Sequence, residues 1–389
     1  MIDVVIPVYK GLEQTRACIE SVLAAPQGTA SEVVVIDDAT PDAAIAEYLA
    51  GLAAQRRITL LVNETNLGFV QSVNRGMALH CDRDVVLLNS DTEVANDWLG
   101  RLHAAANSAP DVATVTPFSN NATICSYPYE GWRGGVPGTL GLAALDALFA
   151  SANARRTIDL PTAVGFCMYI RRDCLNAIGA FDAERFGRGY GEENDFCMRA
   201  GKAGWRNVFA ADVFVYHEGA VSFSDERLDL VKAAAPTLIS LHPEYPLRVH
   251  EFVERDEASA LRAAVDRARS ACGAEESRSV LEERIQERAD IVHELVKLLR
   301  LSWNYEDRVA TLRNEFAQAA ATIEERDRVI ENVKALLAER EAELARVRAG
   351  LSHAETLAFG RQKELDAIHS HWLWRCYNFL ARRLRREAS

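Results

Sequence analysis

The chain has 389 residues, a formal net charge of −12, 49% hydrophobic residues and 26% charged residues. This length exceeds that of one average domain, so we expect a globular domain with a second region attached. The acidic balance argues against a general nucleic-acid-binding protein, in which basic residues are usually in excess. No apolar run approaches the roughly 20 residues that a membrane span requires, and Met1–Pro7 lacks the basic region of a signal peptide.

The eight cysteines are scattered and form neither a C-x-x-C pair nor a metal-ligand spacing. In a chain of this size, such a pattern indicates reduced and mostly buried thiols. Two N-x-T sequons occur, at Asn63 and Asn121. Without a secretion signal we interpret them as chance matches. The sequence therefore predicts a cytosolic protein.

Apolar runs alternate with helical patterns over the first 107 residues. Strands are expected at Val4–Val8, Val33–Ile36, Ile58–Val62 and Val85–Leu88, and helices at Glu13–Leu23, Ala43–Ala54, Phe69–Leu79 and Trp98–Asn107. This alternation predicts βαβ units and a mainly parallel sheet in an α/β domain.

The pattern is less regular from Ser108 onward. Residues 117–141 are rich in Gly, Pro, Asn and aromatic residues, which predicts a long ordered loop rather than a linker. Further strands are expected at Ala163–Ile170 and at Val213–Tyr216, the second ending at His217. A helical pattern resumes near Asp225 and is interrupted by prolines around residue 245.

Beyond about Glu275, proline and glycine nearly vanish and a heptad repeat begins. With Val309 at position a, every a position through Leu351 is apolar, while Arg326 and Arg340 interrupt the d positions. Repeated 3–4 spacing over this length predicts a coiled coil in residues 275–370 and self-association through it. The alternative is a long amphipathic helix packed on the preceding domain.

Residues 371–389 combine four aromatic side chains, Trp372, Trp374, Tyr377 and Phe379, with a run of arginines. Such a tail can lie at a membrane surface, with its aromatic residues buried and its arginines facing anionic headgroups. Equally, it can be a C-terminal helix whose aromatic residues cap the coiled coil.

Four polar clusters follow apolar runs in the first 220 residues. They are Asp37-Asp38, Asn89-Ser90-Asp91, Glu192–Asp195 and His217. Since ligands of open α/β sheets bind outside the carboxyl ends of the strands, we expect these clusters to form one site. A cation, a nucleotide and a general base would account for all of them.

These motifs resemble the family 2 glycosyltransferases of GT-A fold. The resemblance rests on Val4–Tyr9, Val35–Asp42, Asn66–Phe69, Asn74–Gly76, Leu87–Asp91, Gly191–Arg199 and His217–Gly219, which occur in the family's order. It covers residues 1–265 and implies a Rossmann-like sheet with helices on both faces. It also implies inverting transfer of a sugar from a nucleotide-diphosphate donor.

The resemblance implies that Asp37 and Asp38 contact the nucleotide and that Pro7, Val8 and Tyr9 form part of the base pocket. The alternative for Asp38 is the start of the following helix. The residues that would place a loop and a helix beside the nucleotide are Asn66, Gly68, Asn74 and Arg75. Arg75 would meet a phosphate, whereas Gly68 is equally well explained as a turn glycine.

Asp91 lies in the segment that resembles the family's D-x-D motif, with Asn89 in place of the first Asp and Ser90 between them. Carboxylates of this kind bind the Mg²⁺ or Mn²⁺ that neutralises a diphosphate. In similar enzymes a histidine at the position of His217 completes the metal site, and imidazole suits Mn²⁺ better than Mg²⁺. The alternatives are a helix cap at Asp91–Glu93 and a structural histidine.

Glu193 is the candidate general base and replaces the Asp that is usual in the family. It would take the acceptor hydroxyl proton, its pKa raised by the neighbouring carboxylates. Asp195 is the second catalytic candidate and would orient its loop or Arg199, and Glu192 would hold the acceptor. Further acceptor-side candidates are Gly165, Phe166 and Trp132, with Tyr127 and Tyr129 as additional rings. The alternatives are a solvated helix N-terminus for the acidic cluster and an interior strand for Gly165–Met168.

The sequence thus predicts a cytosolic, metal-dependent glycosyltransferase that acts on a glycan or lipid-linked acceptor, with possible contact to the inner face of a membrane. The block Thr116–Ala122 resembles sequences of rhamnosyl- and mannosyltransferases. A nucleotidyltransferase is the rival enzyme class, but the Gly-rich loop that it needs after the first strand is missing. The other rival is a non-catalytic scaffold that acts through the coiled coil.

Overall fold

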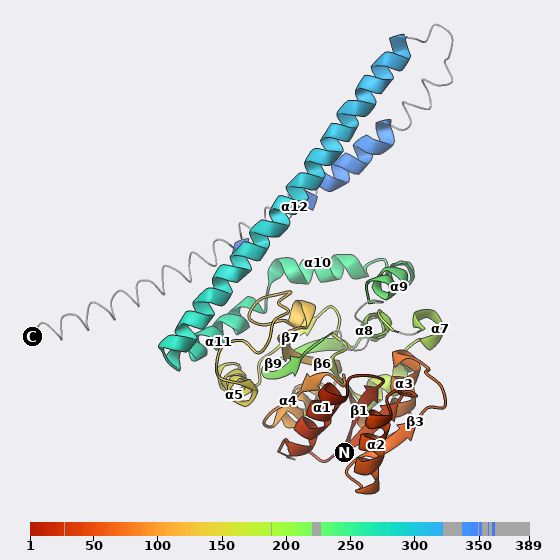
Figure 1. Cartoon of the computed structure of the whole chain (residues 1–389), viewed down its shortest axis with the longest axis vertical. Coiled ribbons are helices and arrows are strands. Elements are labelled where there is room, and N and C mark those ends of the chain that lie inside the picture. The colour runs from red at the N-terminus through yellow and green to blue at the C-terminus, as the bar shows by residue number, and fades with distance from the viewer. Residues whose placement is uncertain are drawn as a thin grey trace, which may run out of the picture. The chain divides into compact units, whose positions relative to one another are not determined.

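The computed structural model describes residues 1–321 except 27, 188 and 220–226, followed by residues 337–348, 350–351, 357 and 360–361. It divides the chain into two units, Met1–Val280 and Leu281–Ser389 (Figure 1). The first unit carries every predicted site residue.

The sheet of the first unit begins with four parallel strands in the order β3-β2-β1-β4. They are β1 (Ile2–Val8), β2 (Ser31–Asp37), β3 (Thr59–Val62) and β4 (Asp84–Leu88). The connecting helices are α1 (Leu12–Ala24), α2 (Ala43–Ala54) and α3 (Phe69–Met77). This half matches the prediction closely, and Val8 pairs with Asp37, which places the predicted nucleotide residues side by side.

The second half of the sheet is mixed rather than parallel. Its strands are β5 (Thr92–Glu93), β6 (Val112–Ser119), β7 (Thr157–Leu160), β8 (Cys167–Ile170) and β9 (Arg206–His217). β8 lies antiparallel between β4 and β6, β6 runs parallel to β9, and β5 and β7 pair antiparallel with β9. The α/β class is confirmed, but the parallel arrangement holds mainly for the first four strands.

The strand β6 is absent from the prediction, which placed a loop from residue 117. All eight of its residues are buried, so it shows no alternation of apolar and polar side chains. It also contains Pro117, and proline is uncommon inside strands. The pairing of β6 with β9 has an irregularity between Pro117 and Phe118, which accommodates the proline.

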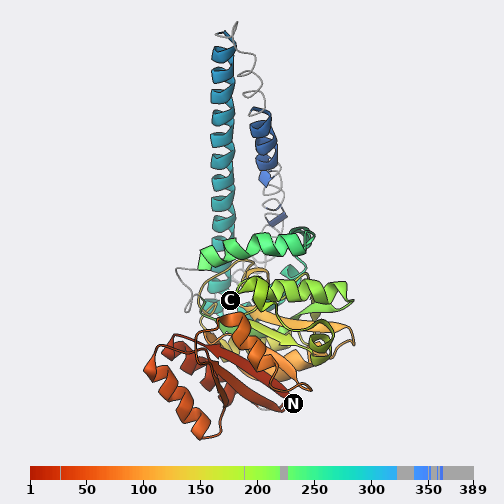
Figure 2. The same cartoon turned by 90° about the vertical axis from the view of Figure 1, so that its right-hand side faces the viewer.

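Helices lie on both sides of the sheet (Figure 2), and the buried hydrophobic residues between the sheet and the helices form two clusters. Val4, Ile6 and Val8 of β1 belong to the first cluster, while Val5 belongs to the second. This division follows from the period of two residues in a strand. The first cluster includes α1, α2, α4 (Trp98–Ala106), α5 (Leu142–Ala152) and α11 (Ser259–Ala271). The second includes α3, α6 (Arg172–Ile178), α7 (Ala183–Phe186), α8 (Glu192–Lys202) and α9 (Arg227–Leu241).

After α10 (Tyr245–Arg255), the helix α11 and the first turn of α12 (Ala274–Ala321) brace the long loop of the first unit. Tyr127 donates a hydrogen bond to Asp266 (2.8 Å) and accepts one from Arg269 (2.9 Å). Glu276 accepts a hydrogen bond from the Thr139 hydroxyl (2.7 Å) and pairs with Arg269 (2.9 Å). The first unit therefore extends beyond the predicted boundary at residue 265.

Within the second unit, two helical segments lie side by side. Arg313 of α12 pairs with Glu341 at 3.0 Å, and Arg361 pairs with Glu287 at 3.6 Å. A single straight helix would separate residues 313 and 341 by about 42 Å, because each residue adds about 1.5 Å. The helical extension is thus an antiparallel pair within one chain, and a seam covered from within the chain does not require a second copy.

The predicted heptad can be followed in part of this unit. Among the described residues of 337–351, the side chains at the a and d positions are buried or half-buried: Leu337, Arg340, Leu344, Val347 and Leu351. The heptad side chains from Val309 to Val333 lie outside the described ones, as does the tail 371–389. No helix among the described residues has the length and apolar character needed to cross a membrane.

Candidate active site

The antiparallel pair of β5 and β9 brings two predicted metal ligands together. Thr92 pairs with His217, so Asp91 lies directly beside the imidazole. Asp91 Oδ1 and His217 Nε2 are 3.5 Å apart, and both side chains are mostly buried. The other oxygen, Asp91 Oδ2, accepts a hydrogen bond from the Gly219 N–H at 3.1 Å. Because Thr92 and Glu93 form a strand and α4 begins five residues later, the helix-cap alternative for Asp91 is wrong.

The hydrogen bond on the far side of the ring assigns the tautomer of His217. Nδ1 lies 2.7 Å from the carbonyl oxygen of Asn121, which can only accept, so Nδ1 carries the proton. In the neutral ring, Nε2 then presents a lone pair to a carboxylate oxygen. Two acceptors that face each other repel unless a proton on Nε2 or a metal ion lies between them, and a histidine that donates its second N–H to a carbonyl is the usual arrangement in metal sites. The pair of residues therefore fits a divalent cation, and a nitrogen ligand favours Mn²⁺ over Mg²⁺.

Two asparagines that the sequence did not single out hold this histidine. Asn120 is 1% exposed, and its Oδ1 accepts the backbone N–H of His217 at 2.8 Å. Its Nδ2 donates to the carbonyl oxygens of His217 (2.9 Å) and Gly134 (2.7 Å). The only signal in the sequence is the Asn-Asn pair in the block that resembles rhamnosyltransferases.

The predicted nucleotide residues gather at the carboxyl ends of β1 and β2. Asp37 and Asp38 are each 5% exposed. Asp37 Oδ1 accepts the N–H of Thr40, whose hydroxyl donates to the carbonyl of Tyr9 (2.7 Å). Asp42, and not Asp38, is the N-cap of α2, so the helix-start alternative for Asp38 is wrong.

Both oxygens of the Asp38 carboxylate accept hydrogen bonds from protein groups. It accepts hydrogen bonds from Asn63 Nδ2 (2.8 Å) and from the N–H groups of Leu67 (2.8 Å) and Gly68 (2.9 Å). Asp38 therefore fixes the loop before α3. Asn63 is 3% exposed, which supports the interpretation of its sequon as a chance match.

The remaining motif residues of this region also have protein partners. Asn66 Oδ1 accepts the Gly68 N–H (3.0 Å), and Gly68 has a φ of 81°, which favours glycine. Arg75 donates to the carbonyl of Val62 (2.7 Å), and Asn74 Nδ2 donates to the carbonyl of Phe181 (2.8 Å). These contacts join α3 to the end of β3 and to the segment between α6 and α7.

The acidic cluster forms the first turn of α8, the place that the alternative interpretation gave it, but Glu192 and Asp195 are buried and Glu193 is half-buried. Glu192 is 4% exposed, and one oxygen of Glu192 and one of Glu193 are buried without a hydrogen-bond partner. Burial raises the pKa of Glu192 well above its ordinary value, and the Glu193 carboxylate raises it further. Burial also raises the pKa of Glu193, while backbone N–H groups of the helix start lower it in part. Desolvation, more than repulsion between carboxylates, is thus the main cause.

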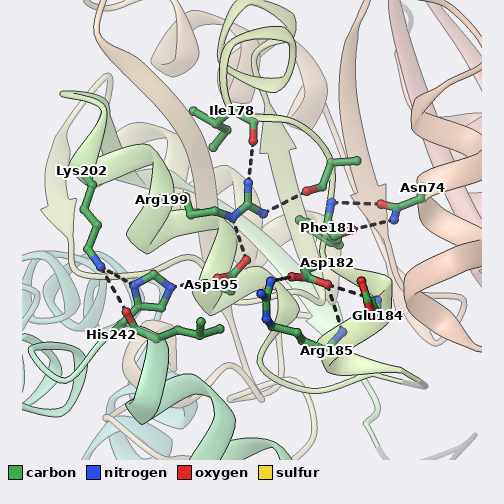
Figure 3. A network of polar contacts seen from close by, with 12 residues as sticks. Asn74, Ile178, Phe181, Asp182, Glu184, Arg185, Asp195, Arg199, Lys202 and His242 are labelled. Atoms are coloured by element: carbon green, nitrogen blue, oxygen red, sulfur yellow. Dashed lines mark hydrogen bonds and ion pairs between the residues drawn. The ribbon is translucent and has the colours of Figure 1, made fainter.

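Asp195 differs from Glu193 because both of its oxygens are engaged. Figure 3 shows Arg199 and His242 on either side of it, with Nε of Arg199 2.8 Å from Oδ2 and Nε2 of His242 2.9 Å from Oδ1. Lys202 Nζ lies 2.8 Å from His242 Nδ1 and can only donate, so Nε2 of His242 donates to Asp195. Arg199 also donates to the carbonyls of Ile178 (2.8 Å) and Ala180 (2.9 Å). Asp195 therefore orients Arg199 and anchors α8.

Gly165 and Phe166 lie between the acidic helix α8 and the Asp91–His217 pair. A methyl group built on Gly165 would lie 3.8 Å from Cγ and Cδ of Glu193. The ring of Phe166 stacks on His217, with centroids 5.3 Å apart, and the backbone carbonyl of Phe166 accepts the Asn89 N–H at 2.9 Å. The interior-strand alternative is confirmed for Cys167 and Met168, which begin β8 between β4 and β6, whereas Gly165 and Phe166 precede that strand. The structure thus brings Glu193, His217 and the Asn89–Asp91 segment around one dipeptide.

The aromatic residues of the long loop divide into two groups. Tyr127 and Tyr129 are buried at 0% and 5% exposure, so neither can stack on a sugar as the sequence suggested. Trp132 is half-buried and packs against Tyr129, with ring centroids 5.2 Å apart. A methyl group at Gly134 would overlap the Trp132 ring, which explains the glycine there.

Asp3, Glu32 and His80 form another group of acidic and histidine side chains, at the amino ends of β1 and β2. Arg83 contacts Asp3 at 3.0 Å and Glu32 at 2.6 Å, so a cation is already supplied by the protein. This group is an ion-pair network at the edge of the sheet opposite to the candidate site.

Comparison with known proteins finds a family model that matches the first part of the chain. Residues 3–179 match the family model described as Glycosyl transferase family 2. The match ends before α8, so the acidic helix and His217 lie beyond it.

Individual relatives are distant. The chain is 26% identical over 206 residues to N-acetylglucosaminyl-diphospho-decaprenol L-rhamnosyltransferase of Mycobacterium tuberculosis (strain CDC 1551 / Oshkosh), covering 48% of this chain and 64% of the relative. It is 25% identical over 239 residues to the uncharacterized protein y4gI of Sinorhizobium fredii, covering 58% of this chain and 25% of that protein. The chain thus spans less than two thirds of either relative. Among solved structures, GalNAc-T7 with UDP, GalNAc and Mn²⁺ is 18% identical with a TM-score of 0.48, covering 67% of this chain and 52% of that one.

Proposed function

We propose that this chain, whose residues 3–179 match the model of glycosyl transferase family 2, is an inverting enzyme that moves a sugar from a nucleotide-diphosphate donor to an acceptor hydroxyl. The observation that carries this proposal is the arrangement around Gly165-Phe166, which contacts Glu193 on one side and His217 on the other. The Glu193 carboxylate, which has one buried oxygen without a hydrogen-bond partner, thus lies beside Gly165. The next residue, Phe166, stacks on His217, the partner of Asp91.

The donor would bind at the carboxyl ends of β1, β2 and β4. Asp37 and the Pro7–Tyr9 segment would contact the base and ribose, while Asp38 holds the loop that closes this side. Asn89 and Ser90 would lie next to the ribose and the diphosphate. Arg75 would meet a phosphate only if it left the carbonyl of Val62.

Asp91 and His217 would hold the cation, Mn²⁺ in preference to Mg²⁺. That cation supplies positive charge to the diphosphate oxygens as a Lewis acid when bound. Asp91 uses one oxygen for Gly219, so the other remains for this role. Asn89 adds no negative charge, and His217 is therefore a more important ligand here than in a site with two aspartates.

Glu193 would accept the proton of the acceptor hydroxyl. As that proton moves to Glu193, the hydroxyl oxygen forms a bond to the anomeric carbon, and the bond from this carbon to the diphosphate breaks. The nucleoside diphosphate leaves with the bonding electrons, and attack from the opposite face inverts the anomeric centre. Glu192, whose burial favours the neutral acid, would donate a hydrogen bond to the acceptor. Trp132 would contact the acceptor sugar from the long loop.

The nature of the substrates is a finer proposal. The Mycobacterium relative acts, by its name, on a decaprenyl-diphosphate-linked N-acetylglucosamine and transfers L-rhamnose. Together with the block Thr116–Ala122, this supports a deoxyhexose or mannose donor and a lipid-linked acceptor of a surface polysaccharide. We place the enzyme at the cytoplasmic face of the membrane, where such acceptors are made.

A donor panel tests the enzymatic proposal. The full-length protein is incubated with Mn²⁺ and dTDP-, UDP- and GDP-linked sugars, and nucleoside diphosphate release is measured. We expect one donor class to be hydrolysed, and Asp91→Asn, His217→Ala and Glu193→Gln to lose most of the rate. The matched control is His293→Ala, which removes an exposed histidine of α12. Equal rates in the wild type and the three site variants would contradict the site, and no hydrolysis of any donor would favour the scaffold.

The membrane proposal needs a separate test. The wild type and a variant that ends at residue 370 are pelleted with vesicles of phosphatidylglycerol and phosphatidylcholine. We expect the wild type alone to pellet, and less of it in high salt because the arginines of the tail provide the attraction. Binding that persists after the deletion would exclude the tail as the anchor.

A further inference from the structure

One buried side chain, that of Asn120, joins three backbone groups from two distant segments. Its oxygen accepts the N–H of His217 (2.8 Å), and its nitrogen donates to the carbonyls of His217 (2.9 Å) and Gly134 (2.7 Å). The Asn120 oxygen also accepts a hydrogen bond from the Ser119 hydroxyl (3.3 Å), and the side chain is 1% exposed. A side chain of this kind determines the position of whatever it holds.

What it holds is the end of β9, where strand pairing stops. His217 is the last residue of β9, and beyond it the described chain consists only of Glu218 and Gly219 before the residues that are not described. The adjacent residue Asn121 accepts the imidazole Nδ1–H (2.7 Å), and its Nδ2 donates to the carbonyl of Glu218 (3.3 Å). The backbone of His217 is thus fixed by Asn120 and its ring by Asn121.

The third bond of Asn120 reaches the long loop. Gly134 lies two residues from Trp132, and no side chain fits at this glycine because the Trp132 ring occupies the space. The Gly134 carbonyl receives its hydrogen bond from Asn120. The position of this part of the loop is therefore tied to the backbone of His217 through one amide group.

We propose that Asn120 is the positioning residue of the metal ligand His217, and that it couples the Trp132 loop to the cation site. The proposal rests on the proposed function, because it takes Asp91 and His217 as ligands of a divalent cation. Asn120 itself touches neither the cation nor the donor. It fixes the direction of His217 Nε2 and holds the loop around Trp132 in a constant position relative to that atom.

Binding of Mn²⁺ alone, followed through the EPR signal of the free ion, tests the first part. We expect Asn120→Ser to bind Mn²⁺ about 10–100-fold more weakly than the wild type, as is typical when an outer partner of a metal ligand is removed. Asn176→Ser is the matched control, since Asn176 is exposed on α6. If Asn120→Ser does not fold, as judged by circular dichroism, Asn120→Asp is used. It retains the acceptor for the His217 N–H, and its added negative charge would by itself strengthen Mn²⁺ binding, so a loss of affinity remains interpretable.

A double variant separates positioning from general damage. If Asn120 acts through His217, then Asn120→Ser adds little to the loss caused by His217→Ala, because the ligand that it positions is gone. Additive losses, or a folded Asn120 variant that binds within twofold of the wild type, would overturn the proposal. A wild type that binds Mn²⁺ no better than His217→Ala would instead remove the cation site itself, and the proposed function with it.

Hydrogen exchange tests the coupling to the loop. We expect peptides that cover residues 129–137 to exchange faster in Asn120→Ser, while in His217→Ala they exchange as in the wild type, because the backbone bonds of Asn120 remain. Unchanged exchange in Asn120→Ser would show that the loop holds its position without Asn120.

Discussion

Substitution of the two acidic candidates in α8 should have opposite effects on activity and stability. Glu193 has a buried oxygen without a partner, whereas Asp195 is bonded at both oxygens by Arg199 and His242. Glu193→Gln should therefore lower kcat by about 10²–10⁴-fold, the usual contribution of a general base. Its melting temperature should stay the same or rise, since a neutral amide replaces a carboxyl group whose ionised form is disfavoured by burial.

The effect of Asp195→Asn on stability follows from the geometry. Asparagine offers one oxygen and one NH₂ group to two donors, so either Arg199 or His242 would face another donor. Loss of a hydrogen bond to a charged group costs roughly 1.5–3 kcal/mol, and we expect a total of about 2–3 kcal/mol. For a domain of this size, 1 kcal/mol lowers the melting temperature by about 2–4 °C. The expected shift is thus on the order of 4–12 °C.

The assay combines thermal unfolding by circular dichroism with initial rates of donor hydrolysis for each variant. Asp173→Asn is the control, because Asp173 forms an ion pair while 70% exposed and should change neither quantity measurably. A kcat loss confined to Asp195→Asn, with wild-type stability, would refute the reasoning. It would make Asp195 the base and Glu193 a structural residue.

Three further predictions concern packing, pH and the domain boundary. Gly76→Ala should lower the free energy of unfolding by about 1–3 kcal/mol, because its Cβ would lie 2.5 Å from a β1 side chain and 2.9 Å from a β2 side chain. Gly51→Ala adds a Cβ with no neighbour within 4 Å, so it should raise the free energy of unfolding by about 0.5–1 kcal/mol in the same denaturant titration. The pKa of Glu192 is raised above 4.5 in the folded state, so the unfolded chain loses this proton at a lower pH than the folded chain does. The free energy of unfolding therefore falls as the pH rises from 4.5 toward the raised pKa. Glu192→Gln should accordingly raise the melting temperature at pH 7 but not at pH 4. Truncation after Val280 should preserve donor hydrolysis. If the second unit mediates self-association, it should also reduce the mass measured by light scattering. Truncation after Ser270 should lower activity as well, because it removes the Glu276 carboxylate that binds Thr139 of the long loop.

The first half of the fold was predictable because its signals are local. Strands β1 to β4 are short apolar runs between amphipathic helices, and α2 begins and ends at the predicted residues. The second half depends on pairings between distant segments. β6 is buried along its whole length, so it lacks the alternation of apolar and polar residues that indicates a strand, and it contains Pro117, which is uncommon inside strands. Its pairing with β8 and β9, which lie about 55 and 95 residues away in sequence, makes it one.

The candidate site shows the same division. Asp91, Glu193 and His217 were recognisable by residue type and order, because carboxylates and histidines carry chemistry that few other residues share. Their supports were not recognisable, since asparagine and glycine occur in many turns. Nothing in the sequence indicates that Asn120 reaches His217 across 97 positions, or that His242 shares Asp195 with Arg199. Conversely, Tyr127 has the composition of a sugar-binding ring but fills the core.

This division explains why several motif residues are engaged with the protein rather than exposed to a ligand. Asp38, Asn74 and Asp195 each bind backbone or side chains of a neighbouring segment. A diphosphate and an attacking hydroxyl must be held within fractions of an ångström of the reactive geometry, and the segments that carry the ligands are loops at strand ends. Such loops are held in place only if polar side chains satisfy their backbone groups. A family motif in this region therefore combines two kinds of residue, those that would touch substrates and those that fix the loops, and only the free oxygens and lone pairs of the folded chain tell them apart.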